Sequence, residues 1–131
     1  MKCLYNIAMH CYRIGVGLVS PWNKKAKLWC EGRRNIFERL SQSIDPTAQI
    51  IWVHVASLGE FEQGRPLIEA LRESHPEYRI LLTFFSPSGY EIRKNYAGAD
   101  YIFYLPLDTP RNARAFLNTV NPEIAIFVKY E

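Results

Sequence analysis

Four short runs of apolar, β-forming residues lie between residues 49 and 128, and a helical segment separates each run from the next. The predicted strands cover residues 49–56, 79–85, 101–105 and 124–128, and the predicted helices cover roughly 60–74, 90–96 and a segment opened by Asp108-Thr109-Pro110. Apolar strands that alternate with helices predict a parallel sheet buried on both faces. The fold class is therefore α/β, corresponding to half of a doubly wound architecture, and residues 41–131 form its single domain.

Details inside the helical segments sharpen this prediction. Leu67, Ile68 and Leu71 share the face that should pack on the sheet. Pro66 is tolerated only near the first turns of a helix, because it lacks a backbone N–H. In the last helix, Thr109 is the expected N-cap and Pro110 the first helical residue.

The first 40 residues differ from the rest of the chain in charge. They hold eight Lys or Arg against two Glu, whereas residues 41–131 hold eight against eleven acidic residues. The net charge of +3 therefore combines about +6 in this leader with about −3 in the domain. A basic leader indicates contact with an anionic surface. No basic run interleaved with aromatic residues occurs in the domain, so nucleic acid is not the predicted partner.

The leader also has an apolar helical face. Its members recur at helical spacing and are Leu4, Ile7, Ala8, Cys11, Ile14 and Leu18. A membrane span is disfavoured because Arg13 near its centre would cost about 2.5–3.5 kcal/mol, and a signal peptide needs an uninterrupted apolar core. We predict a helix lying in the membrane interface, anchored by Trp22, Lys24, Lys25, Lys27 and Trp29. The alternative is a helix docked on the protein's own core.

Candidate site residues follow the predicted strands, because a sheet of this kind binds ligands at the carboxyl ends of its strands. The candidates for substrate binding are Ser57, Gly59, Ser86, Ser88, Gly89 and Asp108, and Glu60 adds a carboxylate beside them. Backbone N–H groups at the two glycine turns would suit an anion. Each residue taken alone also fits a helix cap, which leaves both interpretations open.

Other common sites lack support in the sequence. No GxGxxG follows the first strand, and no P-loop is present. The three cysteines form no CxxC, which suits a reducing compartment. No cluster of residues has metal-ligand spacing, so we expect neither a metal nor a cofactor.

Four stretches together resemble one protein family in order and spacing. They are IWVHVASLGEF, LLTFFSPSG, YLPLDTP and PEIAIFVKYE. They are similar to the N-terminal domain of the Kdo (3-deoxy-D-manno-octulosonic acid) transferases, family 30 glycosyltransferases of lipopolysaccharide biosynthesis. The resemblance covers roughly residues 30–131 and is looser in the leader. It implies that the sheet is the N-terminal, Rossmann-like half of a GT-B fold.

The resemblance also implies an activity. The family moves Kdo from CMP-Kdo to the lipid A precursor lipid IVA, on the cytoplasmic face of the inner membrane and without a metal at the centre. The acceptor sits in the N-terminal domain, and the donor lies mostly in a C-terminal domain, so we expect residues 1–131 alone to be inactive. The alternatives are another GT-B glycosyltransferase with a membrane acceptor, and a non-catalytic α/β module tethered to a membrane.

Residue roles come from the same resemblance. Glu60, the acid of the S-x-G-E turn, matches the family's proposed general base. Glu131 matches the second acid of an E-x-E pattern after the fourth strand, and Lys129 stands in place of the first acid. Phosphates of the acceptor would suit basic residues such as Arg33, Arg34 or Arg65.

Overall fold

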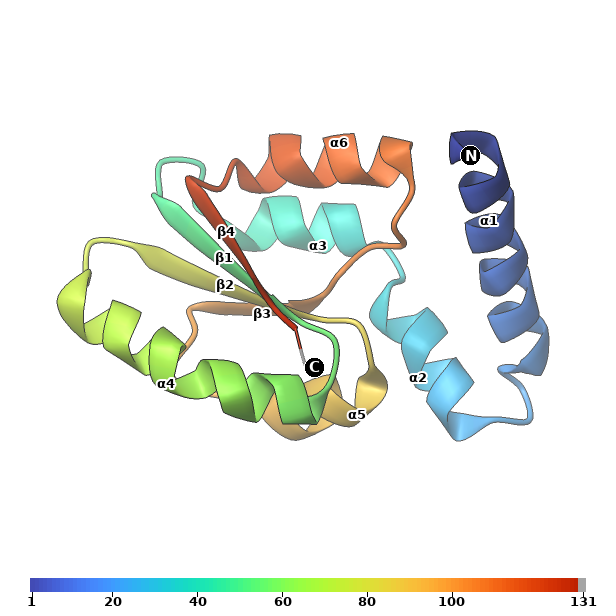
Figure 1. Cartoon of the computed structure of the whole chain (residues 1–131), viewed down its shortest axis with the longest axis horizontal. Coiled ribbons are helices and arrows are strands. Elements are labelled where there is room, and N and C mark those ends of the chain that lie inside the picture. Colours follow the sequence, from blue (N-terminus) through green and yellow to red (C-terminus); the bar gives the residue numbers. More distant parts are fainter. Residues whose placement is uncertain (130–131) are drawn as a thin grey trace.

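The computed structural model describes residues 1–129 and confirms the α/β class (Figure 1). Three helices come first: α1 (Lys2–Val19), α2 (Lys24–Gly32) and α3 (Ile36–Ser43). Strands and helices then alternate as β1 (Ile50–Val55), α4 (Leu58–Ser74), β2 (Arg79–Phe84), α5 (Pro87–Arg93), β3 (Tyr101–Tyr104), α6 (Pro110–Val120) and β4 (Ile124–Val128).

The four strands form one parallel sheet in the order β3-β2-β1-β4. The chain moves from β1 to β2 to β3 in one direction and then returns, through α6, to place β4 on the other side of β1. The direction of winding therefore reverses between β1 and β4. In open α/β sheets, ligands bind at such a switch point, beyond the carboxyl ends of the strands.

Two apolar layers hold the sheet between helices, with α3 and α6 on one face and α4 and α5 on the other (Figure 1). The first layer consists of Ile36, Leu40, Ile44, Ile50, Trp52, Leu81, Phe116 and Val120. The second consists of Ile51, Val53, Val55, Phe61, Ile68, Ile80, Leu82 and Phe84. Alternate residues of β1 and β2 enter opposite layers because successive strand side chains point to opposite faces.

Several local predictions need correction. β4 is an edge strand and not buried on both faces, since Phe127 is 60% exposed and Ile124 is 49% exposed. α4 starts two residues earlier than expected and runs through Pro66 at its middle. Leu67 is 43% exposed, while its neighbour Ile68 is fully buried. α5 also starts earlier, at Pro87, which places Ser88 and Gly89 inside a helix.

The leader helices pack beside the carboxyl ends of the strands, with α1 outermost (Figure 1). Trp29 of α2 is buried and contacts Tyr12 of α1 and Phe85, which follows β2. α1 has no buried residue. In the described part of the chain, no helix is both long and apolar enough to cross a membrane.

Candidate functional site

The β1–α4 corner positions Glu60 at the switch point. Ser57 caps α4, and its hydroxyl oxygen accepts a hydrogen bond from the Glu60 N–H at 3.5 Å. The Glu60 carboxylate in turn accepts one from the backbone N–H of Ala56. This reciprocal arrangement is a variant of the capping box, in which an acid in the first turn reaches back to a backbone donor. The cap therefore fixes the carboxylate at the end of β1.

A hydrogen-bonded cluster lies beside this corner, on the α3–α6 face of the sheet. The Thr83 hydroxyl accepts from Trp52 Nε1 at 2.8 Å and lies 2.9 Å from His54 Nδ1. Burial lowers the pKa of His54, and the nearby Glu60 carboxylate partly offsets that effect. His54 is therefore neutral at pH 7 and holds one wall of the corner.

The β2–α5 corner uses its predicted site residues for structure. Ser86 is the N-cap of α5, and its hydroxyl accepts from the Ser88 N–H at 3.3 Å and lies 2.8 Å from the Ser88 hydroxyl. Gly89 is buried where the backbone passes close to the β1–α4 connection, since a Cβ there would lie 2.6 Å from the Phe84 ring. Gly59 has no such neighbour, with only Ser57 Oγ at 3.9 Å.

Asp108 contacts the leader instead of standing alone at the sheet edge. Its carboxylate accepts a hydrogen bond from the Tyr5 hydroxyl of α1. This bond raises the pKa of Tyr5. The contact joins residues 103 positions apart, so no local pattern in the sequence could predict it.

Arg33 joins the leader to the ends of two strands. Its guanidinium donates to the carbonyl oxygens of Phe85 and Leu105 at 2.9 Å each, and to that of Trp29 at 3.3 Å. It also stacks on the aromatic rings of Trp29, Tyr104 and Phe85, at 4.1, 4.9 and 5.1 Å from their centres. Burial lowers the pKa of Arg33 to about 10, so it stays charged at neutral pH.

A cavity of about 760 Å³ opens beside Arg33, between the leader and the start of α6. We call it the cation pocket, because its lining includes Arg13, Lys27, Arg33 and Arg34 but only one acidic residue, Glu31. Its other walls come from the residues after β3 and from Asn112 of α6. The sequence did not single out Arg13 for this region, because the pocket forms only when α1 packs against α2.

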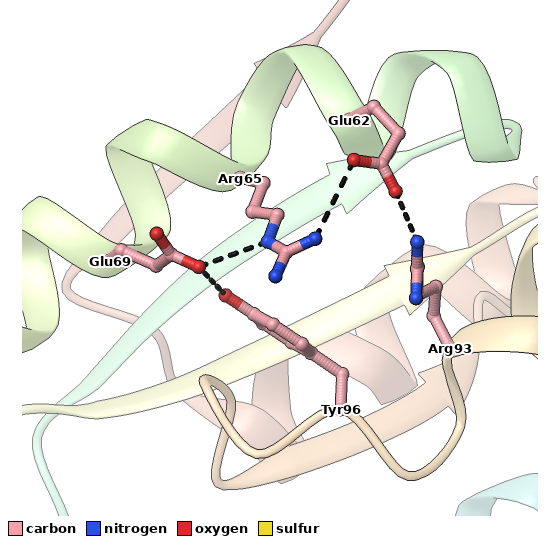
Figure 2. Close-up of polar contacts among 5 residues, drawn as sticks. All are labelled: Glu62, Arg65, Glu69, Arg93 and Tyr96. Carbon is pink, nitrogen blue, oxygen red and sulfur yellow. Dashed lines mark hydrogen bonds and ion pairs between the residues drawn. The ribbon is translucent and has the colours of Figure 1, made fainter.

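Arg65 lies elsewhere, on the side of α4 that faces Arg93 and Tyr96 (Figure 2). It is paired with Glu69 at 3.0 Å and with Glu62 at 3.7 Å, and Figure 2 shows Arg93 and Tyr96 completing what we call the α4 ion network. Arg65 is therefore not brought together with Arg33 and Arg34.

Two further predictions concern the remaining site groups. Within residues 1–129 there is no group of three or more His, Cys, Asp or Glu side chains placed to hold a metal ion. Glu131, the predicted second acid, lies outside the described residues. Lys129 directly follows β4, the strand beside β1 at the switch point.

Comparison with known proteins places this arrangement in a family. The family model described as 3-deoxy-D-manno-octulosonic-acid transferase (kdotransferase) matches residues 32–131. Relatives include the 3-deoxy-D-manno-octulosonic acid transferases of Haemophilus influenzae, 34% identical over 87 residues, and of Aquifex aeolicus, 39% identical over 82 residues. A probable mitochondrial 3-deoxy-D-manno-octulosonic acid transferase of Arabidopsis thaliana is 31% identical over 90 residues.

The matched regions make up 66%, 62% and 68% of this chain but only 20%, 22% and 20% of the three relatives. The chain therefore spans about one fifth of the length of the relatives it matches. The family model, in contrast, covers every strand of the sheet and the S-x-G-E corner. On that match, the chain belongs to the 3-deoxy-D-manno-octulosonic-acid (Kdo) transferase family of glycosyltransferases.

Proposed function

We propose that this chain is the acceptor-binding part of an enzyme that transfers Kdo from CMP-Kdo to lipid IVA in lipopolysaccharide biosynthesis. In this proposal, residues 41–131 form the acceptor domain and residues 1–40 form a basic leader next to the membrane. The observation that supports it most strongly is the Glu60 carboxylate, fixed by its cap at the end of β1 and beside the switch point. The match to the Kdo transferase family supports glycosyl transfer as the reaction in which that carboxylate takes part.

The proposed role of Glu60 is general base. Transfer requires the acceptor hydroxyl to lose its proton as its oxygen attacks the anomeric carbon of Kdo, and a nearby carboxylate can take that proton. A carboxylate has lone pairs on both oxygens, so accepting the hydrogen bond from the Ala56 N–H is compatible with Glu60 taking a proton. Glu131 is the proposed second acid, and Ser57, Ser86 and Ser88 are proposed to line the acceptor's path.

The exposed face of α1 supports a position on the cytoplasmic face of the inner membrane. Tyr5 and Tyr12 contact the domain, whereas the apolar stripe predicted from the sequence faces away from it. Leu4, Ile7, Ile14 and Leu18 of this stripe are 59–70% exposed, and Trp22 beside them is 86% exposed. An apolar stripe with flanking Trp and Lys residues is typical of a helix that lies in a membrane interface. There it would hold the lipid acceptor and the sheet edge together.

The donor, CMP-Kdo, is proposed to bind to a part of the enzyme beyond these residues. We therefore expect the isolated 131-residue chain to have no transferase activity. The relatives' greater length is consistent with this division, since the matched region is about one fifth of each.

The decisive experiment is an assay of Kdo transfer from CMP-Kdo to lipid IVA by the full-length gene product and its Glu60→Gln variant. Glutamine can serve at this position of a capping box, so the variant keeps the hydrogen bond to Ala56 but loses the ability to accept a proton. We expect kcat to fall about a hundredfold to ten-thousandfold. Glu62→Gln is the control, because it removes a carboxylate from the same helix and breaks only the ion pairs with Arg65 and Arg93.

Three outcomes separate the alternatives. Transfer by the wild type with the expected loss in Glu60→Gln supports both the activity and the base. Transfer that Glu60→Gln leaves intact, or that Glu62→Gln lowers equally, reduces Glu60 to a capping residue. No transfer by the wild type refutes the proposed reaction and favours another membrane acceptor or a non-catalytic module.

A further inference from the structure

The cation pocket carries positive charge that the described part of the chain does not neutralise. Residues 1–129 provide no ion pair for Arg13, Arg33 or Arg34. The one acidic residue of the lining, Glu31, lies 3.9 Å from Lys27, and both side chains are more than half exposed. The lining therefore has an excess of three positive charges, being four cations minus one carboxylate.

Arg33 makes this excess costly to the protein. A guanidinium has five N–H donors, and three of those in Arg33 point to backbone carbonyl oxygens. These three hydrogen-bond partners are all neutral, although burial disfavours a charged group without a counter-ion. Backbone carbonyl oxygens and aromatic rings hold the charged guanidinium in place without neutralising it. The pocket can therefore accept an anion.

A sharp turn of the backbone forms part of the pocket lining. Asn35 adopts the left-handed conformation, with φ of 52°, and produces the sharp turn between α2 and α3. Asparagine tolerates this conformation better than most residues. Arg33 and Arg34 stand just before this turn and line the pocket, and α1 supplies Arg13 to the same lining.

We propose that the cation pocket binds a phosphate group, with Arg13 and Arg34 as its outer ligands and Arg33 as its fixed inner charge. Arginine forks pair with phosphate oxygens through two hydrogen bonds, and four cations around one cavity suit a phosphate monoester better than a carboxylate. The pocket itself is inferred from geometry alone. That its phosphate belongs to the acceptor lipid rests on the proposed function.

The test is a calorimetric titration of the 131-residue chain with inorganic phosphate at low ionic strength. Arg34 is exposed, so Arg34→Gln should fold normally. Arg114→Gln is the matched control, because it removes one exposed positive charge from α6 outside the pocket. We expect Arg34→Gln to weaken phosphate binding about tenfold, the usual effect of losing one hydrogen bond to a charged group, and Arg114→Gln to change it less than about twofold.

A second titration identifies the source of the phosphate. It compares vesicles of phosphatidylcholine containing phosphatidic acid, a phosphate monoester, with vesicles in which phosphatidylserine supplies equal surface charge. A lipid source predicts tighter binding to phosphatidic acid, and the loss of that preference in Arg34→Gln. Phosphate binding without this preference keeps the pocket and overturns the lipid as its source.

Two results would overturn the pocket. One is the absence of saturable phosphate binding to the wild type, and the other is an equal loss in Arg34→Gln and Arg114→Gln, which would indicate general electrostatics. Because neither titration needs CMP-Kdo or lipid IVA, a positive result stands even if the full-length product transfers no Kdo.

Discussion

The carboxyl edge of the sheet and the α4 ion network both carry glutamate and arginine side chains, but their charges are arranged differently. In the α4 ion network, Arg65 pairs with Glu62 and Glu69, and Arg93 pairs with Glu62 (Figure 2). These charges therefore neutralise each other at positions that solvent can reach. At the carboxyl edge, Arg33 is part-buried and bonded to neutral carbonyl oxygens. Glu60, likewise, is held by a backbone N–H.

From this contrast we propose that the charges of the carboxyl edge serve a ligand, whereas those of the α4 ion network serve the structure. A network of exposed pairs contributes little to stability and offers little to a ligand, because each charge already has a partner. A charge fixed by neutral groups keeps its field available for a substrate. Glu60 and Glu62 are two residues apart on the same helix, but the Glu60 carboxylate accepts a hydrogen bond from a backbone N–H, whereas Glu62 pairs with two arginine side chains.

The largest expected difference in stability between the two regions concerns Arg33 and Arg65. Arg33→Met leaves three backbone carbonyl oxygens without their donor and should lower the free energy of unfolding by about 3 kcal/mol. Arg65→Met breaks only exposed pairs and should cost less than about 1 kcal/mol. Urea denaturation of both variants measures the difference, and equal losses would show that the carbonyl contacts do not anchor the leader.

Two glycines give a comparison within the carboxyl edge. Gly89→Ala places a Cβ 2.6 Å from the Phe84 ring and 3.0 Å from the backbone nitrogen of Leu58. Both neighbours belong to the packed β1–α4 and β2–α5 corners, so we expect a loss of about 1–3 kcal/mol. Gly59→Ala meets nothing closer than 3.9 Å and should change stability by less than about 0.5 kcal/mol. A thermal unfolding experiment in which Gly59→Ala is less stable than Gly89→Ala would contradict the packing described.

The smallest effect that we expect is a difference in the pH range over which each of the two regions loses stability. The pKa of His54 is lowered by burial, so between its unfolded pKa near 6.5 and its folded pKa the unfolded state binds more protons. Stability from this group is complete above pH 6.5 and is lost as the pH falls through the folded pKa. Asparagine at this position can keep the bond to Thr83, so His54→Asn should flatten the stability curve in this range.

The α4 ion network should respond at lower pH. Hydrogen bonds from Arg65 and Tyr96 lower the pKa of Glu69 from its usual 4.5, so its contribution is present above that value and is lost as the pH falls through the folded pKa. Glu69→Gln should therefore change the curve only below about pH 4.5. Chemical denaturation at a series of pH values checks both variants, and a change by His54→Asn confined to the range of Glu69 would contradict the burial of His54.

Local patterns in the sequence predicted most of the fold. The alternation of apolar runs with helices placed all four strands, and Thr109 and Pro110 start α6 as expected. Glu62 lies three residues before Arg65, and Glu69 lies four residues after it. This spacing indicates that Arg65 forms ion pairs on its own helix. The error over Pro66 arose because tertiary packing keeps α4 continuous despite the missing donor.

The arrangement of the candidate site depended on contacts that no local pattern contains. Arg33 reaches carbonyl oxygens 52 and 72 positions away, and Asp108 is bonded to a tyrosine near the N-terminus. Phe127 is exposed because β4 lies at the edge of the sheet. The order of the strands cannot be predicted from local periodicity. The sequence therefore predicted that these residues meet at one edge of the sheet, whereas tertiary packing decides which of them cap helices and which contact the leader.

We propose that the chemistry belongs to the carboxyl edge of the sheet and not to the neighbouring α4 ion network. The most direct test compares kcat for Kdo transfer to lipid IVA between Glu60→Gln and Glu62→Gln in the full-length gene product. We predict a loss of about a hundredfold to ten-thousandfold for Glu60→Gln, and a change of less than about twofold for Glu62→Gln, which breaks only exposed ion pairs. Comparable activity in the two variants, whether high or low, would contradict the claim.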